Sequence, residues 1–529
     1  MSGRLFSSAL AVLLVLLTVT VTLLMTTRQD VSRLSAEVDQ LSGELERTRT
    51  ELAAAEEAAA EGGSGPAGAE GLGGLLDGLL GGEGGGLLDG LLGGEGGLGG
   101  LLGGEGGGLG GLPGGGDVDL AACLTGDAAG GGGLGALGGG GDPIEGEDAA
   151  AQIADITDRV EELRELERTE ELDIAFLSSP DIEARVTGLV LEDYPAAEAD
   201  IDRRLLSALG AVPADLDLRQ MQADLVSGQV AGFYEPETGE LVVRSDDPDQ
   251  PLGAAEQITL AHEVEHALAD QTLGLDVEDP DQPTDAARAG LAVVEGDATL
   301  TMQRFSLGAF SLSDQLALAS DPEVVGSQQQ LEAFPHVLQA SLLFSYTEGL
   351  GFVCDRYAEG GWDSVDAAYA DRPTTTAEIL DPARYPAPAV EPRASGEPGG
   401  GWEPVRSDTF GAADLLWLFE APGDDTTTAL DAARERAGDW GGGRVTVHTR
   451  GDDTAVGLAL TGGAGEGPGL CESLSAWYDA AFPEAEEAPA EGAELARDGV
   501  DADAVVACEG DDVRLGIAPD LATARALTR

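Results

Sequence analysis

The sequence predicts an α+β protein, with a mainly helical domain and a small edge hairpin over residues 147–396 and an α+β region with an antiparallel sheet over residues 397–529. Apolar residues recur at helical spacing through most of the first range, and two β-rich runs flank the turn Pro236-Glu237-Thr238-Gly239. The second range alternates strand pairs with helices, which is typical of an antiparallel sheet with helices on one face. A chain of 529 residues is too long for one compact core, so extensions and at least two folded units are expected.

The charge of the chain is strongly acidic. Asp and Glu number 98 against 28 basic residues, none of which is lysine, and the formal net charge is -70. Because such a chain has little basic surface to neutralise phosphates, nucleic-acid binding is excluded. Two explanations of the acidic excess remain open, a saline habitat and a GC-rich genome that favours Ala, Gly, Arg and Asp codons.

An uncharged stretch of 23 residues, LFSSALAVLLVLLTVTVTLLMTT, lies between Arg4 and Arg28. It is long enough to cross a bilayer, so residues 1–28 are expected to form a signal anchor and transmembrane helix, with a cleaved signal peptide as the alternative. Arginines flank both ends, so charge does not determine the orientation. The cysteines and the long spacer described next favour a single-pass protein of the cell membrane with its bulk outside the cytoplasm.

Residues 29–60 and 61–146 are expected to separate this anchor from the folded part. Val31, Leu34 and Val38 begin a run of three- and four-residue steps about four heptads long, which predicts a coiled coil and a homodimer. A single solvated helical stalk explains the same pattern equally well. Residues 61–146 are rich in glycine and repeat GLLDGLLGGEGG with a period of twelve residues, which predicts a flexible, disordered low-complexity linker.

The elements of the domain at 147–396 are expected from apolar periodicity and turn residues. Helices are expected at 148–167, near 181–194, 197–209 and 216–227, at 254–270 and at 288–305, with a strand at ELDIAFLSS and a hairpin in QVAGFYEPETGELVVRS, residues 229–245. The first strand of that hairpin, residues 229–234, is expected to offer an open edge to an extended peptide. Coverage of this edge by another part of the chain is the alternative.

The C-terminal region is expected to be built from paired strands and helices. RVTVHTR and TAVGLALTG predict strands, LCESLSAWYDAAF a helix and AVVACEGDDVRLGIA a hairpin, and a short helix follows. The four cysteines are far apart without a C-x-x-C pair, so a cysteine metal site is not expected. In an exported chain they predict two disulfides, of which Cys471–Cys508 is the first expectation, or else four buried thiols.

The most specific chemical signal is TLAHEVEHALADQ, residues 259–271. His262 and His266 lie four residues apart and therefore share one face of a helix, where their imidazoles can bind one metal ion. Glu263 follows the first histidine and lies close enough to contact water at such an ion. Zinc suits these nitrogen ligands, and a catalytic zinc site needs a third protein ligand and an open position.

Glu295 is the first candidate for the third ligand. It lies in RAGLAVVEGDATLTMQRF, residues 288–305, where a carboxylate in an apolar run is unfavourable to bury unless it is paired or binds a metal. Gly296 beside it is expected to let this helix approach the histidine helix closely. The alternatives are that Glu295 points to water, or that His336 or His448 is the ligand.

The spacing of these residues resembles that of the gluzincin class of zinc metallopeptidases, in which H-E-x-x-H is followed by E-G-x-A on a second helix. Here Glu295 follows His266 by 29 positions. The stretches VAGFYEPETGELVV, TLAHEVEHALADQ, LAVVEGDATL and YTEGLGFVCDRYAEGGWDSVDAAYADRPTTTAEIL are similar to a lineage of bacterial and archaeal surface-associated predicted metallopeptidases. The later DTFGAADLLWLF and GDWGGGRVTV also resemble that lineage, and the likeness covers roughly residues 150–450.

This resemblance implies that His262, His266 and Glu295 bind zinc and that Glu263 is the catalytic base. One departure concerns the residue that orients a ligand histidine: the thermolysin-type pattern places Asp four residues after the ligand Glu, and this chain has Thr299 there and Asp297 at the second position. Asp270, one turn beyond His266, is a candidate for the orienting role, and a solvated helix end is the alternative.

The implied activity is zinc-dependent hydrolysis of a peptide or protein substrate, with Glu263 accepting and returning a proton. Tyr346 and then His336 are the candidates for a donor to the developing oxyanion, or else packing residues. Two other functions remain open. The chain could be a non-catalytic envelope scaffold in which zinc joins two helices, or a binding protein that acts through residues 397–529.

Overall fold

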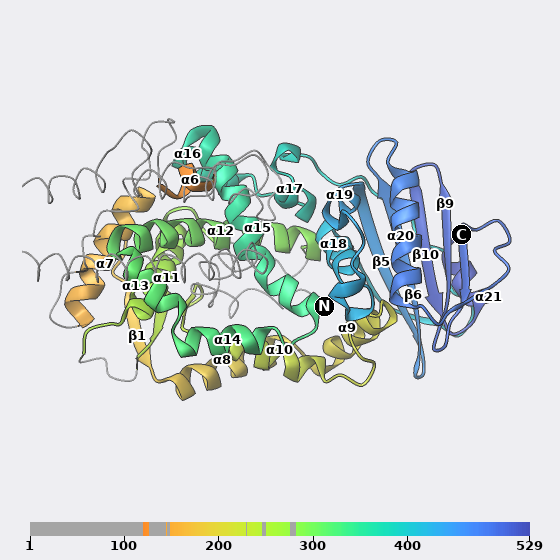
Figure 1. Cartoon of the computed structure of the whole chain (residues 1–529), viewed down its shortest axis with the longest axis horizontal. Helices are drawn as coiled ribbons and strands as arrows, with labels where there is room; N and C mark the ends of the chain where they lie inside the picture. Colours follow the sequence, from red (N-terminus) through yellow and green to blue (C-terminus); the bar gives the residue numbers. More distant parts are fainter. Residues whose placement is uncertain (1–119, 126–143, 145–148, 229, 246–249, 276–281) are drawn as a thin grey trace, which may run out of the picture. The chain divides into compact units, whose positions relative to one another are not determined.

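The computed structural model describes residues 120–125, 144, 149–228, 230–245, 250–275 and 282–529 (Figure 1). The expected anchor at 1–28, the coiled coil at 29–60 and most of the linker at 61–146 lie outside these ranges. The described residues from 122 onward belong to one compact unit. They combine helices with antiparallel sheet, so the α+β class is confirmed.

The helices expected before the hairpin are all present. The chain forms α7 (Ala149–Arg164), β1 (Asp173–Leu177), α8 (Ser179–Asp193), α9 (Ala196–Ala208) and α10 (Leu218–Ser227). Helix α8 begins with Pro180 in its first turn, where a missing backbone N–H costs no helical hydrogen bond. Helix α10 begins where the side chain of Asp217 accepts a hydrogen bond from the backbone N–H of Gln220.

The predicted hairpin is confirmed as β2 (Gly232–Glu235) and β3 (Glu240–Arg244). Its turn ends at Gly239, whose φ of 71° is unfavourable for other residues. Strand β3 also pairs in parallel with β1, so the sheet has the order β1-β3-β2 and β2 is an edge strand. The edge strand packs against the next helix, α11 (Ala254–Thr272).

Three long helices form the centre of this region: α11, α12 (Thr284–Ala309) and α15 (His336–Gly360). The shorter helices are α13 (Leu312–Ala319), α14 (Pro322–Leu331), α16 (Trp362–Ala370) and α17 (Thr376–Leu380). Helix α15 is long and apolar enough to cross a membrane, but 61% of its most apolar stretch is buried inside the protein. This burial is what a core helix of a folded domain shows, and α12 packs along it.

The C-terminal region is a seven-stranded antiparallel sheet in the order β4-β5-β6-β10-β9-β8-β7. Its elements are β4 (Glu403–Thr409), α18 (Ala412–Glu420), α19 (Ala433–Ala437), β5 (Trp440–Arg450), β6 (Asp453–Gly462), α20 (Gly467–Ala481), β7 (Glu486–Glu487), β8 (Leu495–Asp498), β9 (Asp503–Glu509), β10 (Asp512–Ala518) and α21 (Leu521–Leu527). The strands, the helix and the terminal helix expected from the sequence are therefore confirmed.

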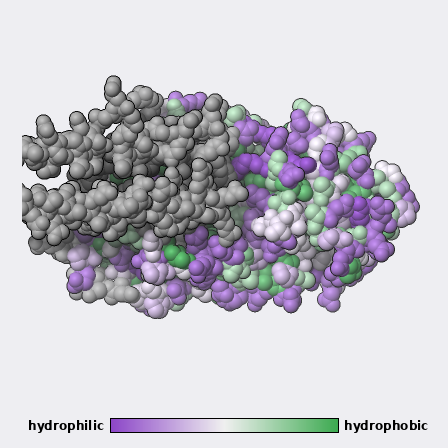
Figure 2. Space-filling model, viewed as in Figure 1, coloured by the Kyte–Doolittle hydropathy of each residue, from purple (hydrophilic) through white to green (hydrophobic). Residues whose placement is uncertain are grey.

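Both faces of this sheet are covered, which corrects the expectation of a single covered face. Consecutive residues of β6 and β10 are buried, although neighbours along a strand point to opposite faces. One face packs Ala455, Val505 and Ala518 against α21. Helix α20 packs against β6, β9 and β10 and lies across the sheet in Figure 1. The coloured part of the surface in Figure 2 is more hydrophilic than hydrophobic, in keeping with the acidic composition.

All four cysteines form disulfides. Cys471–Cys508 joins α20 to β9, as expected, and Cys123–Cys354 joins residues 231 apart in the sequence. Cys123 lies in a short helix, α6 (Leu120–Thr125), inside the range expected to be a flexible linker. A helix was not expected there, and the disulfide to α15 and two hydrogen bonds from Arg304 to the Cys123 carbonyl oxygen hold residues 122–125 on the folded part.

Polar contacts join the helical region to the sheet region. Arg288 of α12 donates to Asp414 of α18 at 2.7 Å, and Arg434 of α19 forms an ion pair with the buried Glu348 of α15. The backbone N–H of Asp285, in the first turn of α12, donates to Thr409 at 3.0 Å. The N-terminal end of α12 is therefore held by the C-terminal region.

Candidate metal centre

Two helices position the candidate ligands. Helix α11 begins after Gly253, whose backbone N–H donates to the Glu256 carboxylate at 2.6 Å, and residues 257–269 are buried on every side. Helix α12 is buried over most of its length. Because both helices lie in the core, polar side chains on them need partners within the protein.

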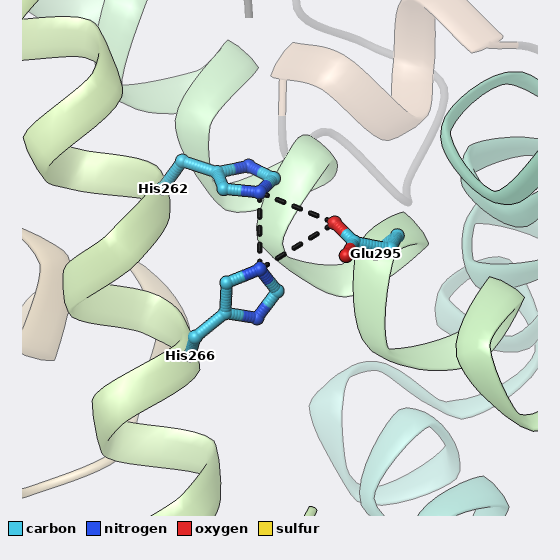
Figure 3. A group of neighbouring side chains, drawn as sticks. All are labelled: His262, His266 and Glu295. Carbon is cyan, nitrogen blue, oxygen red and sulfur yellow. Dashed lines mark hydrogen bonds and ion pairs between the residues drawn. The ribbon is translucent and has the colours of Figure 1, made fainter. Parts of the chain in front are cut away.

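His262 and His266 of α11 converge with Glu295 of α12 (Figure 3). The Nε2 atoms of the two histidines lie 3.0 Å apart. The Oε2 atom of Glu295 lies 3.3 Å from Nε2 of His262 and 3.4 Å from Nε2 of His266. All three side chains are almost completely buried. The three residues singled out in the sequence thus form one cluster.

The geometry of this triangle fits a tetrahedral metal ion. Ligand atoms about 2.0–2.1 Å from a zinc ion lie about 3.3 Å from one another in tetrahedral coordination, which is close to the three distances above. Neither oxygen of Glu295 has another hydrogen-bond partner. A buried carboxylate without further donors is unfavourable unless a cation compensates it, so the residues fit a bound divalent metal.

Burial and the neighbouring charges shift the pKa values of Glu295 and His262. Burial alone would raise the pKa of Glu295, but the two imidazoles outweigh it and hold this pKa at about 2. Burial lowers the pKa of His262, which favours the neutral imidazole that binds metals. An ionised carboxylate beside a neutral His262 imidazole fits the donor set that zinc binds.

Glu263 lies next to this cluster and faces the edge strand. Burial raises the pKa of Glu263 well above its usual value, the carboxylate of Glu295 adds to the increase, and the backbone N–H of Tyr234 on β2 opposes it. A Cβ atom on Gly232 would lie 2.8 Å from Thr259 Cγ2 and 3.5 Å from Glu263 Cγ. The absence of a side chain at Gly232 therefore lets β2 lie directly against the part of α11 that carries Glu263.

Gly296 has a different neighbour from the one expected. A Cβ on Gly296 would lie 2.3 Å from the backbone carbonyl of Gly349, and a Cβ on Gly349 would lie 2.2 Å from the carbonyl oxygen of Ala292. The pair of glycines thus permits a close approach of α12 to α15, so the expectation that Gly296 serves the approach to α11 is wrong.

Several other expected residues are engaged elsewhere. Asp270 accepts a hydrogen bond from Tyr234 Oη at 2.8 Å, so it does not orient His266. His336 contacts Glu420 at 3.1 Å and lies about 15 Å along α15 from Tyr346. His448 lies on β5, 3.6 Å from Glu397. Neither His336 nor His448 belongs to the cluster.

Tyr346 does lie beside the cluster. Its ring is buried and stacks on the ring of His262, with centroids 6.1 Å apart and planes 25° apart. Of the two residues considered as oxyanion donors, only Tyr346 lies beside the candidate ligands. His336, at the start of α15, contacts Glu420 and Asp424 of the C-terminal region instead.

A buried ionic network behind His266 was not expected. Arg164 of α7 donates from Nε to both oxygens of Asp297 at 2.8 and 2.9 Å and pairs with Asp366 of α16. Tyr369 donates to Asp297 at 3.0 Å. Burial opposes the charged form of Arg164, but Asp297 and Glu265 outweigh it and raise the pKa of Arg164. The sequence shows Asp297 as a second acidic residue in the apolar run of α12, but it does not show that Arg164 is the partner of Asp297.

No family model matches this chain, and no curated protein and no solved structure shows significant similarity to it.

Proposed function

We propose that this chain is a membrane-anchored, zinc-dependent metallopeptidase of the gluzincin type, with residues 1–28 as its anchor and its bulk outside the cytoplasm. The observation that carries the proposal is the convergence of His262, His266 and Glu295 on a triangle of tetrahedral dimensions, with Glu263 beside it. The resemblance of the H-E-x-x-H and E-G-x-A motifs to this peptidase class points in the same direction.

In this proposal His262, His266 and Glu295 hold zinc, which when bound supplies the Lewis acidity that acidifies water and polarises a carbonyl group. Glu263 accepts a proton from water and returns it to the leaving amine. Burial raises the pKa of Glu263, which favours a carboxyl group that returns a proton as well as accepting one. Tyr346, stacked on His262, is the candidate for donating a hydrogen bond to the oxyanion.

The substrate proposed is an extended peptide or a segment of a protein. Strand β2 is the last strand of its sheet and lies against α11 where Gly232 leaves room. An added peptide strand would hydrogen-bond to the backbone of β2 and cross the position of Glu263. A backbone-directed mode of this kind fits endopeptidase activity, because it does not require a free peptide terminus.

A scaffold with structural zinc is the competing function. Closed structural zinc sites usually have four protein ligands, and the cluster among the described residues has three. All four cysteines are in disulfides, so no thiolate is available as a fourth ligand. A structural ion also has no need of Glu263. A binding protein acting through residues 397–529 remains a further alternative.

The test compares the purified full-length chain with Glu263→Gln, which keeps the shape of the side chain and removes the base. Zinc content and hydrolysis of a broad peptide library are measured for both. We expect one zinc ion per chain in each protein and hydrolysis by the parent alone. Equal zinc content with no hydrolysis by either protein would favour the scaffold, and no bound metal in the parent would contradict the proposal.

A further inference from the structure

The imidazole of His266 has a second nitrogen that the metal cluster does not use. With a metal ion bound at Nε2, between His262 and Glu295, Nδ1 would carry the hydrogen of the neutral ring and be a donor. This Nδ1 atom is buried and has no hydrogen-bond partner. An unsatisfied buried donor of this kind is unfavourable. The charged atom recorded beside it is Oε2 of Glu265, at 3.7 Å.

Glu265 is equally short of partners. Its side chain is completely buried, neither of its oxygens has a hydrogen-bond partner of normal geometry, and the carboxyl group of Asp297 lies close to it. Its other oxygen, Oε1, lies 3.9 Å from Nε of Arg164. Neighbouring residues on a helix project about 100° apart, so Glu265 reaches toward α7 while its Oε2 atom stays beside the His266 ring.

Arg164 is in turn fixed from several sides. It holds Asp297 through Nε, pairs with Asp366, and lies 4.3 Å from the centroid of the Trp362 ring. The carboxylate of Glu265 thus lies between a fixed guanidinium group and the free nitrogen of a candidate ligand. Four helices (α7, α11, α12 and α16) contribute side chains to this arrangement. The position of Glu265 is therefore held by helices and does not depend on a loop.

We propose that Glu265 is a positioning residue for the metal centre. Its Oε2 atom accepts a hydrogen bond from Nδ1–H of His266 and so keeps the lone pair of Nε2 directed at the metal position between His266, His262 and Glu295. This inference rests on the proposed function, since it assigns a role at the same site. An oxygen of Glu265 accepts in either protonation state, and a small rotation of the carboxylate shortens the 3.7 Å separation to hydrogen-bond length.

The test uses the full-length protein and three variants: Glu265→Leu, Glu265→Gln and the control Asp270→Asn. Asp270 is on the same helix and bonds Tyr234 instead of a candidate ligand. Zn²⁺ affinity is measured by competition with a chelator, and the absorption spectrum of Co²⁺-loaded protein reports the ligand geometry. Thermal unfolding of the metal-free proteins separates loss of fold from loss of the site.

We expect Glu265→Leu to weaken zinc binding roughly 10–100-fold and to shift the Co²⁺ spectrum, as loss of a partner to a ligand histidine does. Glu265→Gln, which still accepts a hydrogen bond, should retain the Co²⁺ spectrum and lose less than about tenfold in affinity. Asp270→Asn should bind like the parent. If metal-free Glu265→Leu melts near the same temperature as the metal-free parent, the lost zinc affinity reflects a change at the metal site and not loss of the fold.

Parent-like affinity and spectrum in Glu265→Leu would overturn the inference while leaving the metallopeptidase proposal intact. If Glu265→Leu does not fold, Glu265→Ala takes its place, because it also removes the acceptor: a parent-like affinity overturns the inference and a weakened one supports it. No metal binding by the parent would instead contradict the proposed function itself, so the two failures are distinguishable.

Discussion

Gly296 of α12 and Gly349 of α15 lie in backbone contact, so close that a Cβ on Gly296 would come within 2.3 Å of the Gly349 carbonyl. Gly296 follows the candidate ligand Glu295 directly. The distance between α12 and α15 therefore helps to determine where the Glu295 carboxylate lies relative to the two histidines of α11. This contact links helix packing to the geometry of the candidate metal centre.

Replacing Gly296 by Ala is expected to push α12 away from α15. Overpacking of this kind destabilises a fold by about 1–3 kcal/mol, and the displaced Glu295 should also weaken zinc binding. Denaturant unfolding and a zinc titration measure the two effects. The matched control is Gly308→Ala on the same helix, where a Cβ meets nothing within 4 Å. It should stabilise the protein by about 0.5–1 kcal/mol, and a similar gain for Gly296→Ala would disprove the close contact.

Removal of metal is expected to lower the stability of the parent. If the proposed zinc is bound, a chelator leaves the buried side chains of His262, His266 and Glu295 without a cation, whereas zinc at about a thousand times its dissociation constant adds about 4 kcal/mol. Thermal unfolding with and without zinc measures the difference. In Glu295→Ala, which has lost one ligand, the melting temperature should respond little to zinc. A response as large as that of the parent would exclude Glu295 as a ligand.

Asp285 is expected to make stability fall as pH rises. Burial raises the pKa of Asp285 to about 7, while hydrogen bonds from Thr376 act in the opposite direction. Between pH 4 and 7 the folded state then binds more protons than the unfolded state, so this contribution is complete below pH 4 and is lost as pH rises through 7. The loss amounts to at most about 4 kcal/mol.

Asp285→Asn removes this titration and keeps an oxygen that can accept from Thr376, which donates to Asp285 at 2.6 Å. Unfolding free energies of the parent and the variant should therefore diverge between pH 4 and 8, with the parent falling more steeply. Parallel curves would show that Asp285 ionises normally in the folded protein.

The disulfide between Cys123 and Cys354 is expected to stabilise the folded part as well as hold α6. Joining residues 231 apart restricts the unfolded chain strongly, so Cys123→Ser paired with Cys354→Ser should lower the unfolding free energy by about 2–5 kcal/mol. Limited proteolysis should then cut near residues 120–125 in the variant more readily than in the parent. Equal cleavage rates would indicate that the contact of Arg304 with Cys123 suffices to hold α6.

Much of the fold could be predicted because its signals are local. The hairpin needed a glycine with positive φ, and Gly239 is placed where the turn requires it. Helices α11 and α12 follow from the spacing of their apolar residues. The covering of both sheet faces was not predicted, because consecutive buried residues in β6 and β10 do not show which helix lies on which face.

The sequence by itself determined that His262 and His266 share a helix face, and that Glu295 is a carboxylate in an apolar helix that needs a partner. These properties depend on periodicity and on the desolvation of a charge, both of which are local. Tertiary structure alone decided that Gly296 contacts Gly349, that Cys123 pairs with Cys354, and that Arg164 and Glu265 lie behind His266. Such choices depend on which helices meet across long sequence separations, and spacing along one helix carries no information about its neighbour.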